Sequence, residues 1–435
     1  MTIILSIIYI ILGFFVYKSY YKIYGFIHPM VWAYIWGFFN FPFRGLNLLI
    51  NGHSNCFPDM IINDEEISYA LLYTIIIMIE RFFVYKDKTH KKILNTDTIV
   101  INNLKRVFNL YKIFIFLIIT IKLYHIYKGD IYSLGDNYGQ VSNEPLYIKF
   151  LDNISLFDYF FILLGLYISK YMPHKKKFIY RTIFILVVCL SFVAFASTSK
   201  GEFIRLITIY FMASSFLNFK INKKYLILFS LCFFIYIGYT YTIRYYGTIS
   251  GRFSSKDISN NIMTYKNNKE SDIYSNKNIF DRLYFLDPII YMNQHTIDKS
   301  DYPYGSVQDL TYIIPRFLWK DKPSITFGNY TSKIFWKNSL KEENPIGQLA
   351  ESYYLWGFLG IIFFPFLTLL VKFAFNTLYV KGTMISKAMF LTIFIRTING
   401  DGAWFTYNYR FVIEALIVLS ILSFYSYKSQ KATII

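Results

Sequence analysis

The chain has 435 residues, of which 55% are hydrophobic and only 17% are charged, whereas a soluble protein of this length would be about a quarter charged. Apolar runs of about 18 residues or more recur along it, which predicts membrane-spanning helices. The net charge of +18 comes mainly from Lys and Arg between these runs, so it indicates membrane orientation rather than a nucleic-acid partner. Three scattered cysteines provide neither a disulfide framework nor a metal site. Composition therefore predicts an all-α polytopic membrane protein embedded in a lipid bilayer.

The apolar runs predict about eleven transmembrane helices, with ends defined to within about four residues. The first run has no basic start and no small-residue cleavage site, so we expect it to be retained. In chain order the predicted helices cover residues 3–21, 26–43, 67–85, 107–126, 154–171, 178–196, 202–218, 225–243, 352–371, 385–399 and 409–427.

The connections between these helices alternate in charge, which sets the orientation. Lys and Arg gather in residues 86–106, 170–177, 220–224, 372–387 and after 427. Acidic residues gather in the intervening connections, at 59–66 and 130–152. We therefore expect the N-terminus outside and the C-terminus in the cytoplasm.

This pattern divides the chain into three parts. Residues 1–243 hold about eight helices, residues 244–351 form a large extracytoplasmic loop, and residues 352–435 hold about three helices. Within the loop, residues 278–295 have apolar side chains at helical spacing, so the loop is expected to contain short helices.

Cationic residues near the predicted outer ends of the helices are candidates for binding phosphate. Arginine suits this role because its planar guanidinium binds phosphate with two hydrogen bonds and stays charged, and a charged residue inside a membrane helix is a functional candidate. The alternative for each residue is structural, as a solvated side chain or a local ion pair. The candidates are Arg44, Lys200, Arg205, Arg244, Arg396 and Arg410.

The loop itself carries a second set of candidates. Arg316, Trp319 and Lys322 belong to a proline-containing aromatic segment, which suits a sugar-binding turn or, alternatively, a turn packed on the membrane. His295 and Glu351 are the candidate general bases. The alternative for each is structural, since a lone histidine is more often a structural residue and Glu351 could pair with an arginine. The sequence has no GxxxxGK[ST], no HExxH and no Asp-x-Asp motif, so neither metal nor cofactor is expected.

Three segments of the loop resemble bacterial oligosaccharide repeat-unit polymerases, the Wzy-type polymerases of O-antigen and capsule. They are Gly305, the sequence IPRFLWKDKPS at 314–324, and IGQLAESYYLWGFLG at 346–360. The family also has a turn of small residues with an arginine ahead of a mid-chain helix, and STSKG at 197–201 is similar, with Lys200 in place of that arginine. The motifs cover about 60 residues, while the expected topology extends the resemblance to most of the chain.

The resemblance implies a glycosyltransferase of the bacterial plasma membrane. Its substrates would be oligosaccharides linked to undecaprenyl diphosphate, which is the leaving group at the outer face of the membrane. It also implies a flippase and a chain-length regulator as partners, in the synthesis of lipopolysaccharide or capsule. In this interpretation Arg205, Arg244, Arg316 and Arg396, with Arg410 and Lys200, bind the two diphosphates. Glu351 or His295 takes the proton of the acceptor hydroxyl.

Two other functions remain open at this point. A ligase of the same broad architecture would move finished polymer to another acceptor. A flippase for lipid-linked oligosaccharides would have short loops and repeated halves, and the long loop between 244 and 351 argues against it.

Overall fold

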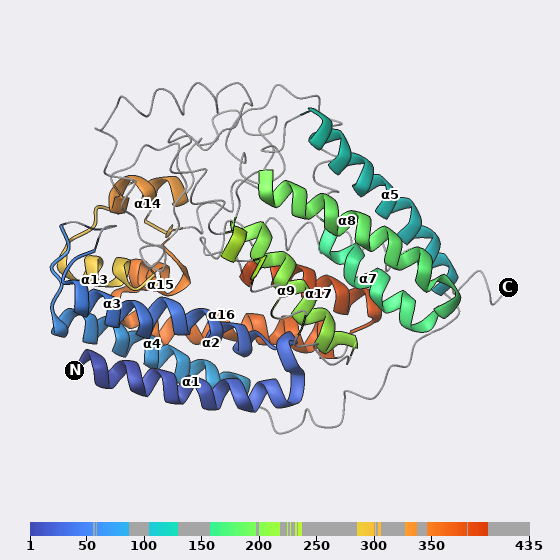
Figure 1. The fold of residues 1–435 in the computed structure, drawn as a ribbon. Coiled ribbons are helices and arrows are strands. Elements are labelled where there is room, and N and C mark those ends of the chain that lie inside the picture. The colour runs from blue at the N-terminus through green and yellow to red at the C-terminus, as the bar shows by residue number, and fades with distance from the viewer. Residues whose placement is uncertain are drawn as a thin grey trace, which may run out of the picture. The chain divides into compact units, whose positions relative to one another are not determined.

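The computed structural model of the chain describes a set of helices and the short segments between them (Figure 1). The described residues are 1–54, 57, 59–86, 104–128, 157–196, 200–217, 224, 227, 231–232, 234–236, 285–299, 301, 303–305, 327–336, 346–380 and 382–398. Within them all regular secondary structure is helical, as the composition predicts.

The chain forms two compact units. The first unit consists of Met1–Lys105 and Ile279–Ile435, and the second of Arg106–Asn278. The helices of the first unit are α1 (Thr2–Tyr24), α2 (Pro29–Phe38), α3 (Arg44–Asn51), α4 (Asp64–Tyr85), α13 (Asp287–Gln294), α14 (Phe327–Trp336), α15 (Gln348–Trp356), α16 (Gly360–Ala374) and α17 (Met384–Ile398). The second unit is built from α5 (Leu104–Lys128), α7 (Asp158–Tyr171), α8 (Lys176–Ala196) and α9 (Lys200–Leu217).

The described residues hold four helices long and apolar enough to cross a membrane, at Thr2–Ile27, Asp64–Tyr85, Leu104–Tyr124 and Pro173–Ala194. A bent pair, Gln348–Ile362 and Phe364–Val380, makes a fifth if it counts as one span. The chain is thus a membrane-embedded helical protein, but the described part does not reproduce the predicted count of about eleven. Three of the predicted spans are present as short helices, namely α7, α9 and α17. Two more lie wholly or mostly outside the described residues, at 409–427 and 225–243.

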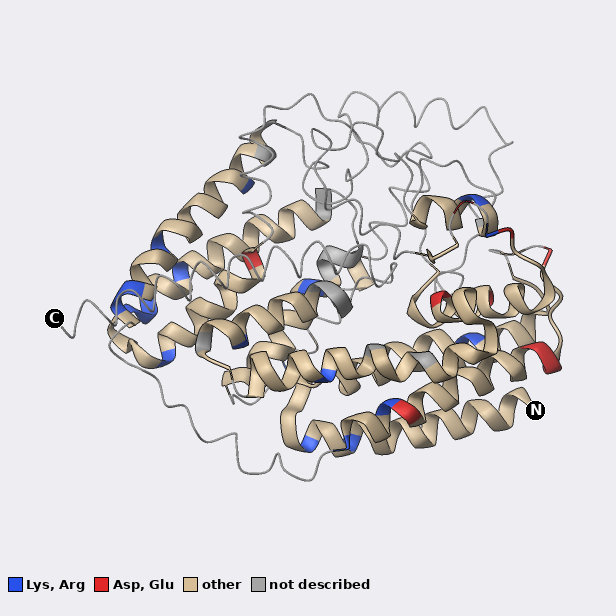
Figure 2. Cartoon of the chain, turned by 180° about the vertical axis from the view of Figure 1, so that it is seen from behind, with Lys and Arg blue, Asp and Glu red and all other residues tan. Residues whose placement is uncertain are grey.

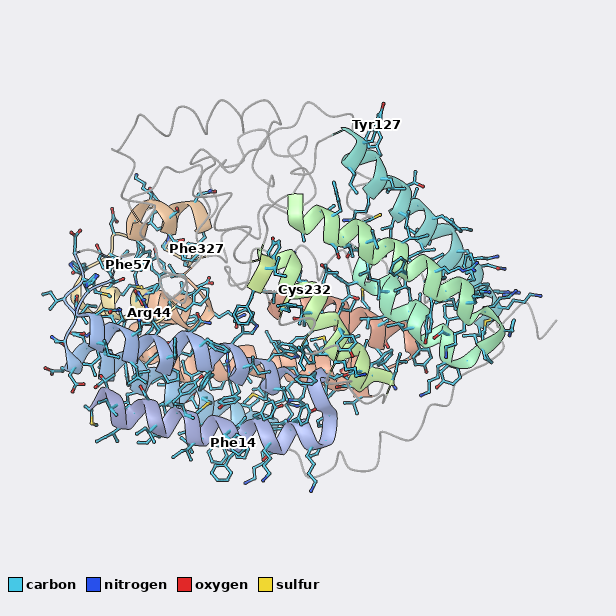
Figure 3. All side chains as sticks on the ribbon, viewed as in Figure 1. Phe14, Arg44, Phe57, Tyr127, Cys232 and Phe327 are labelled. Carbon is cyan, nitrogen blue, oxygen red and sulfur yellow. The ribbon has the colours of Figure 1, made fainter. Side chains whose placement is uncertain are left out.

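The first helix shows why these segments belong in lipid. Apolar side chains surround α1 on all sides, so it has no polar face to turn toward water. Phe14 is 53% exposed and points away from the other helices (Figure 3), as do several isoleucines of the same helix. Such exposed apolar surface is unfavourable in water and is satisfied by lipid chains.

The second predicted span is not one regular helix. A π-helical turn, η2 (Phe39–Phe43), separates α2 from α3 and contains Pro42. Proline has no backbone N–H and disrupts the regular hydrogen-bond ladder, which accounts for the irregular turn. The helical path consequently continues to Asn51, beyond the predicted end at residue 43.

Contacts at helix ends establish the relative directions of α1, α4 and α16. The amino group of Met1 lies 2.7 Å from the Asp64 carboxylate, so α1 and α4 begin at the same end of the unit. The Lys372 amine donates a hydrogen bond of 2.7 Å to the backbone oxygen of Val84, so α16 and α4 also finish together. These three helices are parallel, as alternation predicts for the first, third and ninth spans.

The two ends of this unit differ in charge. Figure 2 shows acidic residues beside the N-terminus, where Asp64, Glu65 and Glu66 begin α4. The opposite end carries Lys22 on α1 and Lys372 on α16. This is the same asymmetry that the sequence uses to predict orientation.

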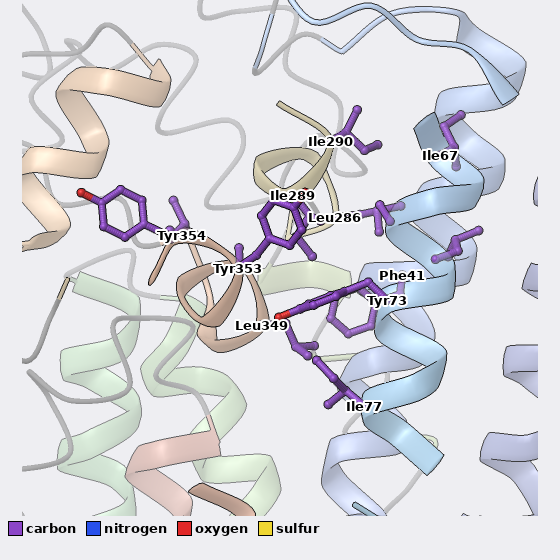
Figure 4. Packing of buried hydrophobic residues seen from close by; sticks show 14 of the residues in the cluster. Phe41, Ile67, Tyr73, Ile77, Leu286, Ile289, Ile290, Leu349, Tyr353 and Tyr354 are labelled. Carbon is purple, nitrogen blue, oxygen red and sulfur yellow. The ribbon is translucent and has the colours of Figure 1, made fainter. Parts of the chain in front are cut away.

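The short helices of the predicted loop share one hydrophobic core with the membrane helices. Leu286, Ile289 and Ile290 of the α13 region pack with Ile67 of α4, and Leu349 of α15 packs near Tyr73 and Ile77 of α4 (Figure 4). The described part of the loop is therefore docked on the bundle through apolar contacts.

A buried ion pair reinforces this docking. The Arg44 guanidinium donates two hydrogen bonds to the Asp287 carboxylate, 2.9 Å from Nε and 2.6 Å from Nη2. Ser54 donates a third hydrogen bond to Asp287 at 2.7 Å. Arg44 and Asp287 are only 1% and 0% exposed, so each neutralises a charge that the interior would otherwise leave unpaired. The pair joins α3 to the first turn of α13.

We predict that Asp287→Ala lowers the free energy of unfolding by about 3–5 kcal/mol, because it leaves the Arg44 guanidinium buried and unpaired. The double variant Arg44→Met, Asp287→Leu should recover most of this loss, since both charges are then gone. Denaturation of the purified protein in detergent measures both effects.

The matched control is Asp64→Ala, which removes the partner of the exposed Met1 amino group and should cost much less stability than Asp287→Ala, because water solvates both of these charges. Equal stability of Asp287→Ala and the unmodified protein would contradict the structural role of the pair.

Candidate functional site

Helix α15 lies beside the middle of α4. Leu349 lines the same cleft as Thr74 and Ile77, which are near the middle of α4. The path turns by 92° between Gln348–Ile362 and Phe364–Val380, the geometry of a broken span or a re-entrant loop. Gly357 follows α15 with a positive φ of 58°, a backbone conformation that favours glycine and ends the helix. Pro365 has no backbone N–H and so removes a hydrogen bond from α16. The predicted span 352–371 is thus two helices with a break.

Glu351 occupies the first turn of α15 and is only 3% exposed. A carboxylate in the first turn is favoured by the partial positive charge of the helix N-terminus. Its Oε1 lies close to Gly305: a Cβ atom at position 305 would be 3.3 Å from Oε1 and 3.3 Å from Leu355. Gly305 also has φ 55°, which side chains other than glycine rarely adopt. Two segments of the family resemblance therefore meet at this carboxylate.

Lys299 places a cation beside the second half of α15. Its amine donates a hydrogen bond to the backbone oxygen of Tyr354 and lies 5.0 Å from the centre of that ring. Burial lowers the pKa of the Lys299 amine. Tyr330 of α14 donates a hydrogen bond to the backbone oxygen of Asp298, and burial raises the pKa of its hydroxyl. Helices α14 and α15 are thus linked through the segment at 298–299.

His295, the other candidate base, ends α13. Its Nδ1 lies 3.1 Å from the backbone oxygen of Tyr291, and its ring stacks on the Tyr291 ring with centres 4.2 Å apart. If Nδ1 carries the proton for this contact, Nε2 is an acceptor, as a general base requires. Helices α13 and α15 pack against each other, so both candidate bases lie on neighbouring elements.

A polar chain connects these two helices to α4. The Tyr353 hydroxyl donates to the side-chain oxygen of Asn293 at 3.0 Å, and the Asn293 amide donates to Glu66 at 2.7 Å. The Tyr353 hydroxyl also lies 3.4 Å from that of Tyr69. These side chains present hydroxyl, amide and carboxylate groups beside aromatic rings. Such a combination of polar and aromatic groups is suited to binding a carbohydrate.

The structure tests the predicted cationic residues only in part. Arg205 lies in the second unit, half-buried in the second turn of α9, so the description does not relate it to Glu351. Lys200 and Arg396 lie in α9 and α17, with side chains outside the described set. Residues not described at all are Arg244, Arg316, Trp319, Lys322 and Arg410. Their roles stay predictions.

Arg44 has a different role from the one expected of it. Its guanidinium is held by Asp287, Ser54 and Asn47, so it is a structural cation and not a ligand for phosphate. Sequence reasoning could not identify this pairing because Asp287 is 243 positions away.

A second buried ion pair was not predicted. In the second unit, Lys122 of α5 lies 3.3 Å from the Asp158 carboxylate at the start of α7, and the two side chains are 4% and 2% exposed. Lys122 itself, inside the apolar stretch 107–126, was the available signal, because a charge within a membrane helix requires a partner.

Comparisons with protein-family models, with curated proteins and with solved structures found no match for this chain.

We predict that Gly305→Ala is more destabilising than Gly52→Ala. Both residues have positive φ, 55° and 67°, so both substitutions strain the backbone by about 1 kcal/mol. A Cβ at Gly52 meets nothing within 4 Å, whereas at Gly305 it presses on Glu351 and Leu355. Unfolding midpoints of the two variants in detergent should therefore differ, and equal midpoints would contradict close packing of Gly305 on Glu351.

Proposed function

We propose that this protein polymerises lipid-linked oligosaccharide repeat units at the outer face of a bacterial plasma membrane. The reaction is glycosyl transfer: the acceptor hydroxyl attacks the anomeric carbon of the donor glycan, and undecaprenyl diphosphate leaves. Bond cleavage at the carrier supplies the driving force, so the reaction requires no nucleotide. The product is O-antigen or capsular polysaccharide.

The observation that best supports this proposal is the buried Glu351 carboxylate beside Gly305. It is held inside a membrane-embedded bundle, on a short helix at a break in the chain, and next to the segments that carry the family resemblance. A carboxylate here would accept the proton of the attacking hydroxyl. An amphiphilic substrate would reach it laterally from the bilayer, with its glycan on the side of α13 and α14.

The cationic residues would stabilise the leaving diphosphate. Negative charge develops on the bridging oxygen as the glycosidic bond breaks, and preorganised arginines stabilise that charge best where water is excluded. We assign this role to Arg205, Arg244, Arg316 and Arg396, with Lys200 and Arg410 beside them, and the sugar contacts to Trp319 and Lys322. The proposal places the N-terminus outside the membrane and the C-terminus in the cytoplasm, with about eleven membrane spans in all.

The proposal predicts that Glu351→Gln abolishes chain extension, since the amide cannot take a proton. We expect a loss of at least about 100-fold in polymer, the usual contribution of a general base. The measurement is the length of surface glycan on gels, in a strain lacking the gene and complemented with each variant at matched membrane abundance.

The matched control is Glu65→Gln, which removes an exposed carboxylate from the acidic end of α4 and should leave a normal ladder. Normal polymer from Glu351→Gln would refute the role of Glu351. Full-length polymer from alanine variants of all four arginines would refute the diphosphate assignment. Complete loss of attached glycan, with no single repeat units, would indicate a ligase instead.

A further inference from the structure

Helix α15 packs on α13, and α13 is attached to the rest of the unit at both of its ends. The buried pair of Arg44 and Asp287 holds its first turn. At its last residue, the Gln294 side chain forms two hydrogen bonds with the backbone of Ile61, donating to the carbonyl oxygen at 2.7 Å and accepting from the N–H at 2.9 Å. Attachments at both ends fix the position and direction of this short helix, so it is a firm support for α15.

Asn293 connects α13 to both α4 and α15. Its amide nitrogen donates a hydrogen bond of 2.7 Å to the Glu66 carboxylate, and its side-chain oxygen accepts one of 3.0 Å from the Tyr353 hydroxyl. A carboxylate only accepts hydrogen bonds, so the nitrogen of the amide must face Glu66 and its oxygen must face Tyr353. The Tyr353 hydroxyl therefore has a defined acceptor on a helix whose own position is fixed.

Two consecutive tyrosines hold α15 from different sides. The Tyr353 ring, whose side chain is only 8% exposed, meets the Tyr73 ring edge-on with centres 5.3 Å apart and the Tyr69 ring with centres 6.4 Å apart. Tyr354 points in another direction (Figure 4) and packs on Phe327 of α14, with ring centres 5.3 Å apart. Consecutive helical residues are about 100° apart around the axis, so contacts at both tyrosines fix the rotation of α15.

The rotation of α15 determines where the Glu351 carboxylate lies. Glu351 is two residues before Tyr353 and therefore on nearly the opposite face of the helix, where its Oε1 lies close to Gly305. The tip of a helical side chain is about 5–6 Å from the axis, so a rotation of about 10° moves it by about 1 Å. A misplacement of about 1 Å can reduce the rate of a catalysed reaction about 100-fold.

We propose that Tyr353 is a positioning residue for Glu351, and that its hydrogen bond to Asn293 holds the carboxylate at the acceptor hydroxyl. This inference rests on the proposed glycosyl transfer and adds a residue that acts through Glu351. Ring packing at Tyr353 leaves some freedom of rotation, whereas a hydrogen bond has a narrow range of distance and direction. Loss of the hydroxyl should therefore leave α15 folded but less precisely oriented.

The test measures chain extension by the purified full-length protein in liposomes, with lipid-linked repeat units as the substrate. Tyr353→Phe keeps the ring and removes the hydroxyl. We expect kcat to fall about tenfold at an unchanged KM, which is less than the effect of a full 1 Å displacement because the ring contacts remain. Asn293→Ala removes the acceptor of the same hydrogen bond and should lower kcat by a similar factor. It decides the question if Tyr353→Phe does not fold.

The matched control is Tyr20→Phe. Tyr20 is 7% exposed, and its hydroxyl donates a hydrogen bond of 3.2 Å to the backbone oxygen of Phe82, which joins α1 to α4 and not to α15. Each substitution removes one hydroxyl hydrogen bond from a buried tyrosine, so the two unfolding midpoints should fall by similar amounts. Only Tyr353→Phe should lower kcat, which separates positioning from general stability.

A double variant tests whether Tyr353 acts through Glu351. In the Glu351→Gln background, Tyr353→Phe should cause no further loss of the residual rate, because the group that it positions is gone. With Glu351→Gln inactive, the positioning role alone is overturned by any of three results: an unchanged kcat in Tyr353→Phe, a raised KM in place of a lowered kcat, or a further loss in the double variant. Full activity of Glu351→Gln, or no extension by the unmodified protein, would instead overturn the proposed function and this role with it.

Discussion

The ion pair between Arg44 and Asp287 is the interaction on which the arrangement of the first unit depends. It links two parts of the chain 243 positions apart and is almost completely buried. A charge in such a place is stable only with its partner, so the pair allows one placement of α13 against α3 and disfavours others. Helix α13 in turn packs on α15, which carries Glu351. The position of the candidate carboxylate therefore follows from a pair that takes no part in the proposed chemistry.

Charges inside this protein have two distinct roles. Arg44 with Asp287, and Lys122 with Asp158, are matched pairs that hold helices together. Arg81 has no ion-pair partner among the described residues, and its guanidinium lies over the Phe364 ring. This distinction comes from geometry, because the apolar sequence around each of these cations does not show which of them is paired.

The sequence predicts the helical character, the membrane location and most helix positions because long apolar runs have few alternative structures. It also predicts correctly that α1 and α4 run in the same direction, since alternation follows from loop charge. It fails at 352–371, where hydropathy alone cannot distinguish a span from two helices with a break. Gly357 and Pro365 were the local signals of that break.

The candidate site was predictable to a smaller degree. Glu351 and Gly305 were both noted from short motifs, and the structure brings them into contact. The ion pair of Arg44 was not predictable, because nothing in a single sequence indicates which of many acidic residues will be its neighbour.

The most direct test of the central claim is reconstitution. Lipid-linked repeat units extracted from a strain lacking the gene would be added to the purified protein in liposomes, without nucleotide sugars. We expect a ladder of longer lipid-linked glycans, with one undecaprenyl diphosphate released for each unit joined. Repeat units that stay single while the protein is folded, or a ladder that forms only when a nucleotide sugar is supplied, would contradict it.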